Sequence, residues 1–264
     1  MPKVTAASLK LAKQRGEKFT CLTAYDATFA ALFDKAGIDV LLVGDSLGMV
    51  IQGHDSTIPV TLDEITYHCR AVATARPRAL VMADMPFMSF ATVDQALASA
   101  ACLMQRGGAE MVKLEGSDKQ VEIIRALADQ GVASCAHLGL RPQSVHKLGG
   151  YRVQGRDEDQ ARRLLAEASA MEAAGADMIL LECVPAELAA DITGSVRIPV
   201  LGIGAGNSCD GQVLVSYDLL GLTQRRIPRF VKNYLTGHDS VESAVQAYID
   251  DVKSGRFPGP EHSF

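Results

Sequence analysis

The chain has 264 residues, of which 48% are hydrophobic and 22% are charged, and its formal net charge is −5. This composition is typical of a globular protein with a large core and excludes a disordered chain. The negative charge leaves no basic footprint for nucleic acid, so an anionic ligand would need a local cation or a metal. No apolar run approaches the length of a membrane span.

The six cysteines are scattered, without a CxxC pair or a Cys/His cluster at zinc spacing. Reduced thiols in a cytoplasmic protein fit this pattern best. The N-terminus carries lysines among isolated apolar residues, so we do not expect a secretory signal. A transit peptide is a weak alternative. Leu9 and Leu11 favour a short amphipathic helix over Ala7–Gln14 that covers one end of the fold.

Short apolar runs alternate with helical patterns along the whole chain, which is typical of βα units on a parallel sheet. Eight such units favour a closed (β/α)₈ TIM barrel over an open doubly wound sheet, because closure leaves no exposed edge. The eight predicted strands are Phe19–Ala24, Val40–Val43, Leu80–Ala83, Met111–Leu114, Val132–Ala136, Met178–Leu181, Val200–Ile203 and Gln212–Val215.

Capping boxes predict helix starts at Thr61–Glu64, Thr92–Gln95 and Ser117–Gln120. A final amphipathic helix is predicted over Val241–Lys253, followed by a tail over Gly255–Phe264. No linker or low-complexity segment divides the chain. We therefore expect a single barrel domain over residues 1–264, with an N-terminal helix, a C-terminal helix and a tail.

Polar side chains stand at the ends of five consecutive predicted strands. In a barrel, the carboxyl ends of the strands meet on one face, where the active sites of this fold lie. The sequence therefore predicts a shared site there. Its candidate residues are Asp45, Ser46, Asp84, Lys113, Glu115, His137 and Glu182.

Asp45, Asp84 and Glu115 are hard oxygen donors suited to Mg²⁺, whereas zinc would favour histidine pairs or thiolates. Each acid alone is equally consistent with a helix cap or a surface charge. Lys113 stands two residues before Glu115, so both side chains face the same way on a strand. Its ammonium would hold a substrate carboxylate or stabilise an enolate, unless it forms a structural ion pair. His137 is either a substrate hydrogen-bond donor or a satisfied core histidine.

Glu182 follows an apolar run and precedes Cys183-Val184-Pro185. This setting should raise the pKa of its carboxyl group toward that of a general base, although a buried acid paired to a helix start fits as well. The glycines of Gly202–Gly206 resemble a phosphate-cradling loop in composition, and tight packing explains them equally well.

Seven segments spread over nearly the whole chain closely resemble the ketopantoate hydroxymethyltransferase family. They include the stretches VGDSLGMVIQGHDSTIPVTLDE, VKLEG and LLECVP. The segments are Leu22–Asp26, Val43–Glu64, Ala83–Phe90, Val112–Gly116, Ala136–Val145, Leu180–Pro185 and Gly202–Leu222.

The resemblance implies a barrel of the phosphoenolpyruvate/pyruvate type. It also implies transfer of a hydroxymethyl group from methylenetetrahydrofolate to 3-methyl-2-oxobutanoate, giving ketopantoate for pantothenate synthesis. By motif position, Asp45 and Asp84, with Glu115 nearby, would bind one Mg²⁺. Glu182 would accept the proton. The 2-oxo acid would be held by Asp45, Ser46, Asp84 and Lys113.

The resemblance further implies a homodecamer of two stacked rings. Two positions depart from the family pattern, since Arg141 stands where the family often has threonine and Tyr217 where it often has histidine. Arg141 follows His137 closely, so it is expected to touch the folate tail or a neighbouring subunit.

Two alternatives remain open. The first is another Mg²⁺-dependent 2-oxo acid lyase or aldolase of the same barrel superfamily, whose metal, substrate class and base would look alike. The second is a non-catalytic barrel that binds a metabolite or forms a scaffold. Such a barrel would lack the metal acids or the base, and this sequence lacks none of them.

Overall fold

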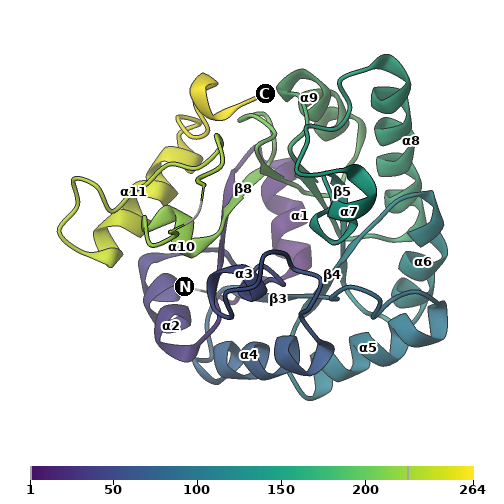
Figure 1. The fold of residues 1–264 in the computed structure, drawn as a ribbon, viewed down its shortest axis with the longest axis horizontal. Coiled ribbons are helices and arrows are strands. Elements are labelled where there is room, and N and C mark those ends of the chain that lie inside the picture. The colour runs from purple at the N-terminus through teal and green to yellow at the C-terminus, as the bar shows by residue number, and fades with distance from the viewer. Residues whose placement is uncertain (1, 225) are drawn as a thin grey trace.

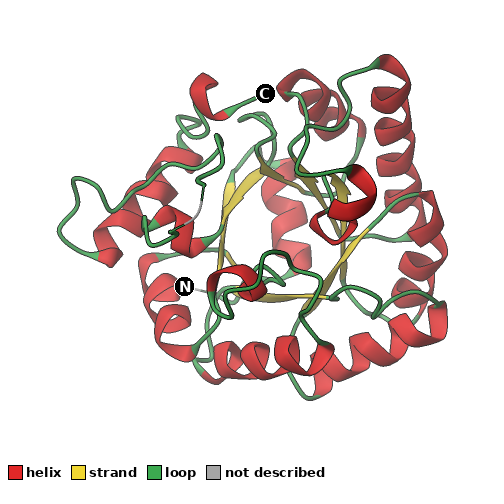
Figure 2. Cartoon of the chain, in the orientation of Figure 1, coloured by secondary structure: helices red, strands yellow, loops and turns green. Residues whose placement is uncertain are grey.

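The computed structural model describes residues 2–224 and 226–264. Its eight parallel strands form a closed barrel in sequence order, and β1 pairs with β8 to complete the ring. Figure 2 shows this ring of strands surrounded by helices, so the predicted (β/α)₈ barrel is confirmed. The strands are β1 (Phe19–Thr23), β2 (Val40–Val43), β3 (Leu80–Asp84), β4 (Met111–Glu115), β5 (Ser134–Gly139), β6 (Met178–Glu182), β7 (Val200–Ile203) and β8 (Gly211–Leu214).

Helices follow the strands and cover the outside of the barrel (Figure 1). None of them, within the residues described, is long and apolar enough to span a membrane. The α-helices are α1 (Ala6–Gln14), α2 (Ala27–Ala36), α3 (Leu47–Val50), α4 (Leu62–Thr74), α5 (Val93–Gln105), α6 (Val121–Asp129), α7 (Val145–Leu148), α8 (Glu158–Ala174), α9 (Ala186–Ser195), α10 (Ser216–Leu219) and α11 (Val241–Lys253), and the 3₁₀ helices are η1 (Asp118–Gln120), η2 (Pro142–Ser144) and η3 (Pro260–His262).

Two of the three predicted capping boxes are complete, at Thr61 and at Ser117. The third is only half formed. Thr92 accepts a hydrogen bond from the Gln95 amide, but the Gln95 side chain accepts from the backbone of Ala91 instead of Thr92. A long amide side chain can reach back one residue further, so α5 still begins where it was predicted.

The predicted limits of β5 were wrong. Val132 does not enter the strand, because its N–H bonds back to the carbonyl of Leu127 and closes the end of α6. The strand instead begins at Ser134 and continues through His137 to Gly139. The strands β3, β4 and β6 also run one residue further than predicted, so that each ends in an acid.

Side chains along each strand alternate between the two faces of the barrel wall. On β3, Val81 and Ala83 pack under the helices, whereas Leu80 and Met82 belong to a second cluster in the interior. Leu9 of α1 joins this interior cluster, so α1 closes one end of the barrel. In Figure 1, α3 and α7 lie over the opposite end. The site must therefore form from the interior positions nearest to that end.

Candidate functional site

The interior face changes from apolar to polar at the carboxyl ends of the strands. On β3 the inward series Leu80, Met82 continues to Asp84, two residues further along. The same alternation carries β4, β5 and β6 into polar residues, and strand pairing sets Asp84 beside Lys113 and Glu115 beside His137. The strands thus bring together five predicted residues: Asp84, Lys113, Glu115, His137 and Glu182.

Asp84 forms a buried ion pair with Lys113 and also accepts a backbone hydrogen bond. Lys113 Nζ donates to Asp84 Oδ1 at 2.5 Å, and the backbone N–H of Asp45 donates to Asp84 Oδ2 at 3.0 Å. Burial alone would lower the pKa of Lys113, but the charges of Asp84 and Asp45 raise it. The ammonium therefore stays charged, and the ion pair that the sequence left as an alternative is present.

Asp45 and Glu115 share a region crowded with negative charge. Burial, followed by the charge of Asp84, raises the pKa of Asp45 to about 7. Burial and the charge of Asp45 raise the pKa of Glu115 well above its ordinary value. Such carboxylates are stabilised by a cation, and their hard oxygens are the ligands that Mg²⁺ prefers.

The acids nevertheless do not form a preformed metal site with three protein ligands. Across residues 2–224 and 226–264, no group of three or more His, Cys, Asp or Glu side chains is placed to hold a metal ion. Mg²⁺ is commonly held by only one or two carboxylates together with water and substrate oxygens. Asp45 and Asp84 are suited to supply those two carboxylates, while the role of Glu115 as a third ligand stays a prediction.

Gln143 connects two of the acids and was missed in the sequence. Its side-chain Nε2 donates to Asp45 Oδ2 at 2.8 Å and to the Met85 carbonyl at 3.0 Å. Its backbone N–H donates to both oxygens of Glu115, at 3.1 and 3.2 Å. Gln143 lies in η2, where no apolar periodicity marks it. The one available signal was its position within the segment Ala136–Val145.

Ser46 also has a partner that the sequence did not reveal. The hydroxyl groups of Ser46 and Tyr25 lie 2.9 Å apart, and Tyr25 is buried two residues after the end of β1. Burial raises the pKa of the Tyr25 phenol, so the group stays neutral and can orient the serine hydroxyl. The signal for Tyr25 was its place in the Leu22–Asp26 segment.

Glu182 and His137 face each other across β5 and β6. His137 Nε2 lies 3.2 Å from Glu182 Oε2, but among the described residues neither ring nitrogen has a partner with hydrogen-bond geometry. Burial lowers the pKa of His137 well below its ordinary value, so the ring is neutral. Burial raises the pKa of Glu182 to about 8. A carboxyl group with this pKa has the basicity expected of a general base near neutral pH.

The turn at the end of β5 leaves no room for a side chain beside Glu182. Gly139 has φ +89°, and a Cβ there would lie 2.4 Å from the Glu182 carbonyl oxygen. Only glycine accepts both conditions. The residue after Glu182, Cys183, also has a positive φ of 49°. The backbone that carries the predicted base is therefore held in an unusual conformation.

The glycines of Gly202–Gly206 are explained by packing. A Cβ at Gly204 would lie 2.9 Å from the ring of Phe230, and one at Gly206 would lie 2.6 Å from the Ala186 Cβ. The Gly206 carbonyl accepts a hydrogen bond from Gln212 at 3.0 Å. Of the two interpretations left open, close packing is the one that these contacts support.

A closed parallel barrel with a buried set of acids, an ammonium and a neutral histidine at its strand ends defines a TIM-barrel enzyme. Solved structures with the same fold include 2,3-dimethylmalate lyase, a PEP mutase/isocitrate lyase superfamily member (TM-score 0.59, 21% identity, 83% of this chain and 84% of that one). Another is phosphonopyruvate hydrolase in complex with oxalate and Mg²⁺ (TM-score 0.60, 17% identity, 80% of each chain). At these identities the comparison shows that the fold is shared.

The family model for ketopantoate hydroxymethyltransferase matches residues 3–260, and the chain belongs to this family. The chain is 59% identical to a 3-methyl-2-oxobutanoate hydroxymethyltransferase of Alkalilimnicola ehrlichii, over 99% of this chain and 94% of the relative. It is 57% identical to the enzyme of the same name from Shewanella amazonensis, over the full length of both. The predicted resemblance is confirmed.

Proposed function

We propose that the protein transfers a hydroxymethyl group from methylenetetrahydrofolate to 3-methyl-2-oxobutanoate, forming ketopantoate in pantothenate biosynthesis. The observation that carries this proposal is the largely buried carboxyl group of Glu182, whose side chain is 15% exposed, opposite a neutral histidine and close to a charged lysine. Abstraction of the C3 proton of a 2-oxo acid needs a base of this kind beside groups that stabilise an enolate.

Mg²⁺ is the proposed metal, and Asp45 and Asp84, with Glu115 nearby, would hold it. The buried carboxylates have the hard oxygen donors that this ion requires. When bound, Mg²⁺ would supply Lewis-acid stabilisation of the keto and carboxylate oxygens of the substrate. A magnesium-bound member of the fold, the phosphonopyruvate hydrolase structure with oxalate, motivates the same choice.

Substrate binding is assigned to groups that surround these acids. The Ser46 hydroxyl, oriented by Tyr25, would donate to the substrate carboxylate. The Lys113 ammonium, fixed by Asp84, would offset the negative charge that grows as the enolate forms. In the part of the chain that the structure describes, neither ring nitrogen of His137 makes a hydrogen bond, so its N–H would donate to a substrate oxygen.

Glu182 would take the C3 proton, and the C3 carbon would then form a bond to the methylene carbon of the folate donor. The methylene carbon is held by two folate nitrogens, and both C–N bonds break: one is replaced by the bond to C3 and the other by a bond to the oxygen of a water molecule. Each nitrogen takes up one proton, one originating from C3 and one from the water. Glu182 gives the C3 proton to a departing folate nitrogen, so the base is regenerated.

We also propose a cytoplasmic homodecamer of two stacked rings. Large apolar side chains such as Tyr67 (61% exposed) and Met88 (59% exposed) are candidates for burial between subunits. The six cysteines are unpaired, which agrees with a reducing compartment. Sedimentation of the purified protein as a monomer or dimer would contradict the decamer.

Product formation tests the proposed reaction. The purified protein is incubated with 3-methyl-2-oxobutanoate, methylenetetrahydrofolate and Mg²⁺, and ketopantoate is followed by NMR. We expect product with these three components and its loss when EDTA removes the metal. If the protein forms no ketopantoate but cleaves a 2-oxo acid or its phosphonate analogue, the alternative function as a lyase would be supported instead.

A further inference from the structure

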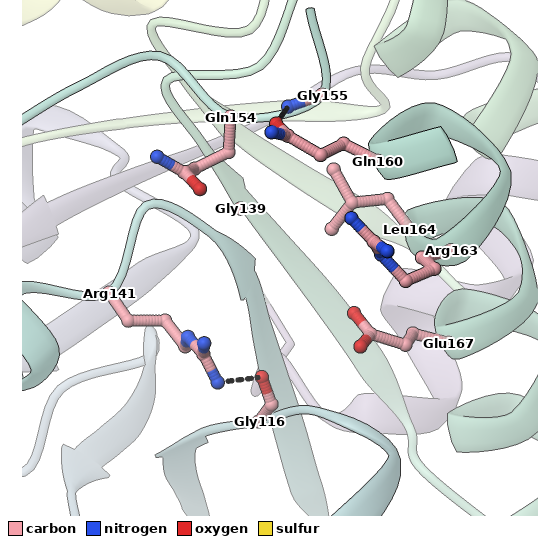
Figure 3. A pocket seen from close by; sticks show the side chains of 9 residues that line it. All are labelled: Gly116, Gly139, Arg141, Gln154, Gly155, Gln160, Arg163, Leu164 and Glu167. Atoms are coloured by element: carbon pink, nitrogen blue, oxygen red, sulfur yellow. Dashed lines mark hydrogen bonds between the residues drawn. The ribbon is translucent and has the colours of Figure 1, made fainter. Parts of the chain in front are cut away.

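A polar cavity lies outside the acid cluster, by which we mean Asp45, Asp84, Glu115 and Glu182. It is formed between the ends of β4 and β5 and helix α8 (Figure 3). Its volume is about 220 Å³, and no residue of the acid cluster lines it. A Cβ on Gly116 would contact Met171 of α8 at 3.1 Å, so this wall of the cavity faces the helix and not the barrel interior. The cavity is therefore a separate compartment beside the proposed active site.

Two guanidinium groups from different elements line the cavity. Arg141 comes from the segment after β5 and donates to the Gly116 carbonyl at 3.2 Å, whereas Arg163 comes from α8. Within the described residues, neither arginine forms an ion pair. Figure 3 shows both side chains directed toward the same space. An arginine has five N–H donors in a planar fork, so this pair offers free donors for an oxyanion.

Hydrogen-bond acceptors also line the cavity, close to the two arginines. Glu167 lies on α8 below Arg163, and burial raises the pKa of its carboxyl group while Arg141 lowers it. Gln154 donates its Nε2 to the Arg152 carbonyl at 2.9 Å, which leaves its Oε1 to accept a hydrogen bond in the cavity. Two positive charges and one negative charge give the lining a net charge of +1, which suits a monoanionic carboxylate better than a dianionic phosphate.

We propose that this cavity binds a carboxylate with a neighbouring N–H donor. The carboxylate would be held by Arg141 and Arg163, and the N–H group by Gln154 Oε1 or Glu167. Two sources carry this chemistry: a free α-amino acid, and the glutamyl end of a folate. Only the second source rests on the proposed function, because it requires folate as the co-substrate.

Binding of L-glutamate, tetrahydrofolate and tetrahydropteroate, which lacks the glutamyl group, separates the two sources. Calorimetry on the full-length protein compares wild type with Arg163→Gln and Arg141→Gln. The matched control is Arg162→Gln, which removes the same charge from the exposed neighbouring position on α8, where Arg162 pairs with Asp159. We expect about tenfold weaker binding in both pocket variants and wild-type affinity in the control.

If the glutamyl end occupies the cavity, the pocket variants weaken tetrahydrofolate but not tetrahydropteroate. If a free amino acid occupies it, they weaken L-glutamate and leave both folates unchanged. The proposal is overturned if no probe binds, or if every probe binds the pocket variants as well as it binds Arg162→Gln. None of these measurements needs turnover, so their failure is distinguishable from failure of the proposed reaction.

Discussion

At the scale of single residues, polar side chains at the ends of apolar runs revealed most of the candidate site. Asp84, Glu115 and Glu182 could be predicted because each stands at the carboxyl end of a strand that the sequence predicts. Gln143 could not, because it reaches the acids from a 3₁₀ turn whose sequence has no period. Its contacts depend on how the segment after β5 folds back over the barrel.

Gln143→Met should misplace Asp45 without removing any acid. The substitution keeps the backbone N–H that serves Glu115 but loses the Nε2 donor to Asp45 and to Met85. We expect a fall of about 10- to 100-fold in the rate of C3 proton exchange of 3-methyl-2-oxobutanoate and in Mg²⁺ affinity. Gln130→Met, at an exposed position, is the matched control. Unchanged exchange and metal affinity in Gln143→Met would contradict this role.

The raised pKa of Glu182 predicts a dependence of stability on pH. Its pKa is about 8 in the folded protein and near 4.5 when unfolded, so the folded state keeps a proton that the unfolded state has lost between these values. The stabilisation is present below pH 4.5 and is lost as the pH rises through 8. Glu182→Gln cannot ionise and escapes this loss.

Urea unfolding of the metal-free protein measures this effect. We expect the free energy of unfolding of Glu182→Gln, relative to wild type, to rise by on the order of 3 kcal/mol between pH 4.5 and pH 8. Glu187→Gln replaces an exposed acid five residues further along and should show no such trend. A difference between Glu182→Gln and wild type that does not change with pH would show that Glu182 ionises normally.

At the scale of elements, apolar runs predicted which segments form strands and in what order. β2 and β7 match their predicted limits, since a glycine, Gly44 or Gly204, directly follows each run. β3, β4 and β6 extend to an acid because the polar residue continues the strand pairing, as Asp84 does opposite Lys113. The pattern of apolar residues alone cannot predict that a strand continues to a polar residue whose side chain lies in the barrel interior.

The end of β5 is the element whose backbone most directly supports the predicted base. Gly139→Ala introduces strain at φ +89° and a contact of 2.4 Å with the Glu182 carbonyl oxygen. We expect a loss of about 2–4 kcal/mol in the free energy of unfolding. Gly131→Ala is matched to it, with φ +74° and open space around the new Cβ, and should cost about 1 kcal/mol. Equal losses in the two variants would mean that the backbone around Glu182 moves away from the new Cβ without lowering the free energy of unfolding.

At the scale of the whole molecule, the two ends of the barrel have different tasks. The end closed by α1 is apolar, whereas the opposite end holds the ionisable groups. In this fold, substitutions at the closed end should alter stability, and those at the open end should alter chemistry. The alternation along the strands allowed this division to be anticipated, but the sequence did not predict the charged cavity beside α8, which depends on tertiary packing.

Leu9→Ala tests whether the closed end of the barrel affects stability without affecting the chemistry. Leu9 is 3% exposed in the interior cluster, so we expect the cavity it leaves to cost about 2–4 kcal/mol in the free energy of unfolding. The C3 exchange rate of the folded variant should equal that of wild type. Leu11→Ala on the same helix, at a residue that is 43% exposed, should change stability by less than about 0.5 kcal/mol. A slower exchange in Leu9→Ala would mean that the two ends are coupled.

Exchange of the C3 proton of 3-methyl-2-oxobutanoate in D₂O, followed by NMR with Mg²⁺ and without folate, tests whether Glu182 is the catalytic base. Glu182 as the base predicts exchange in wild type, a loss of at least about 100-fold in Glu182→Gln, and a wild-type rate in Glu187→Gln. No exchange in wild type, or an undiminished rate in Glu182→Gln, would show that Glu182 is not the base that removes this proton.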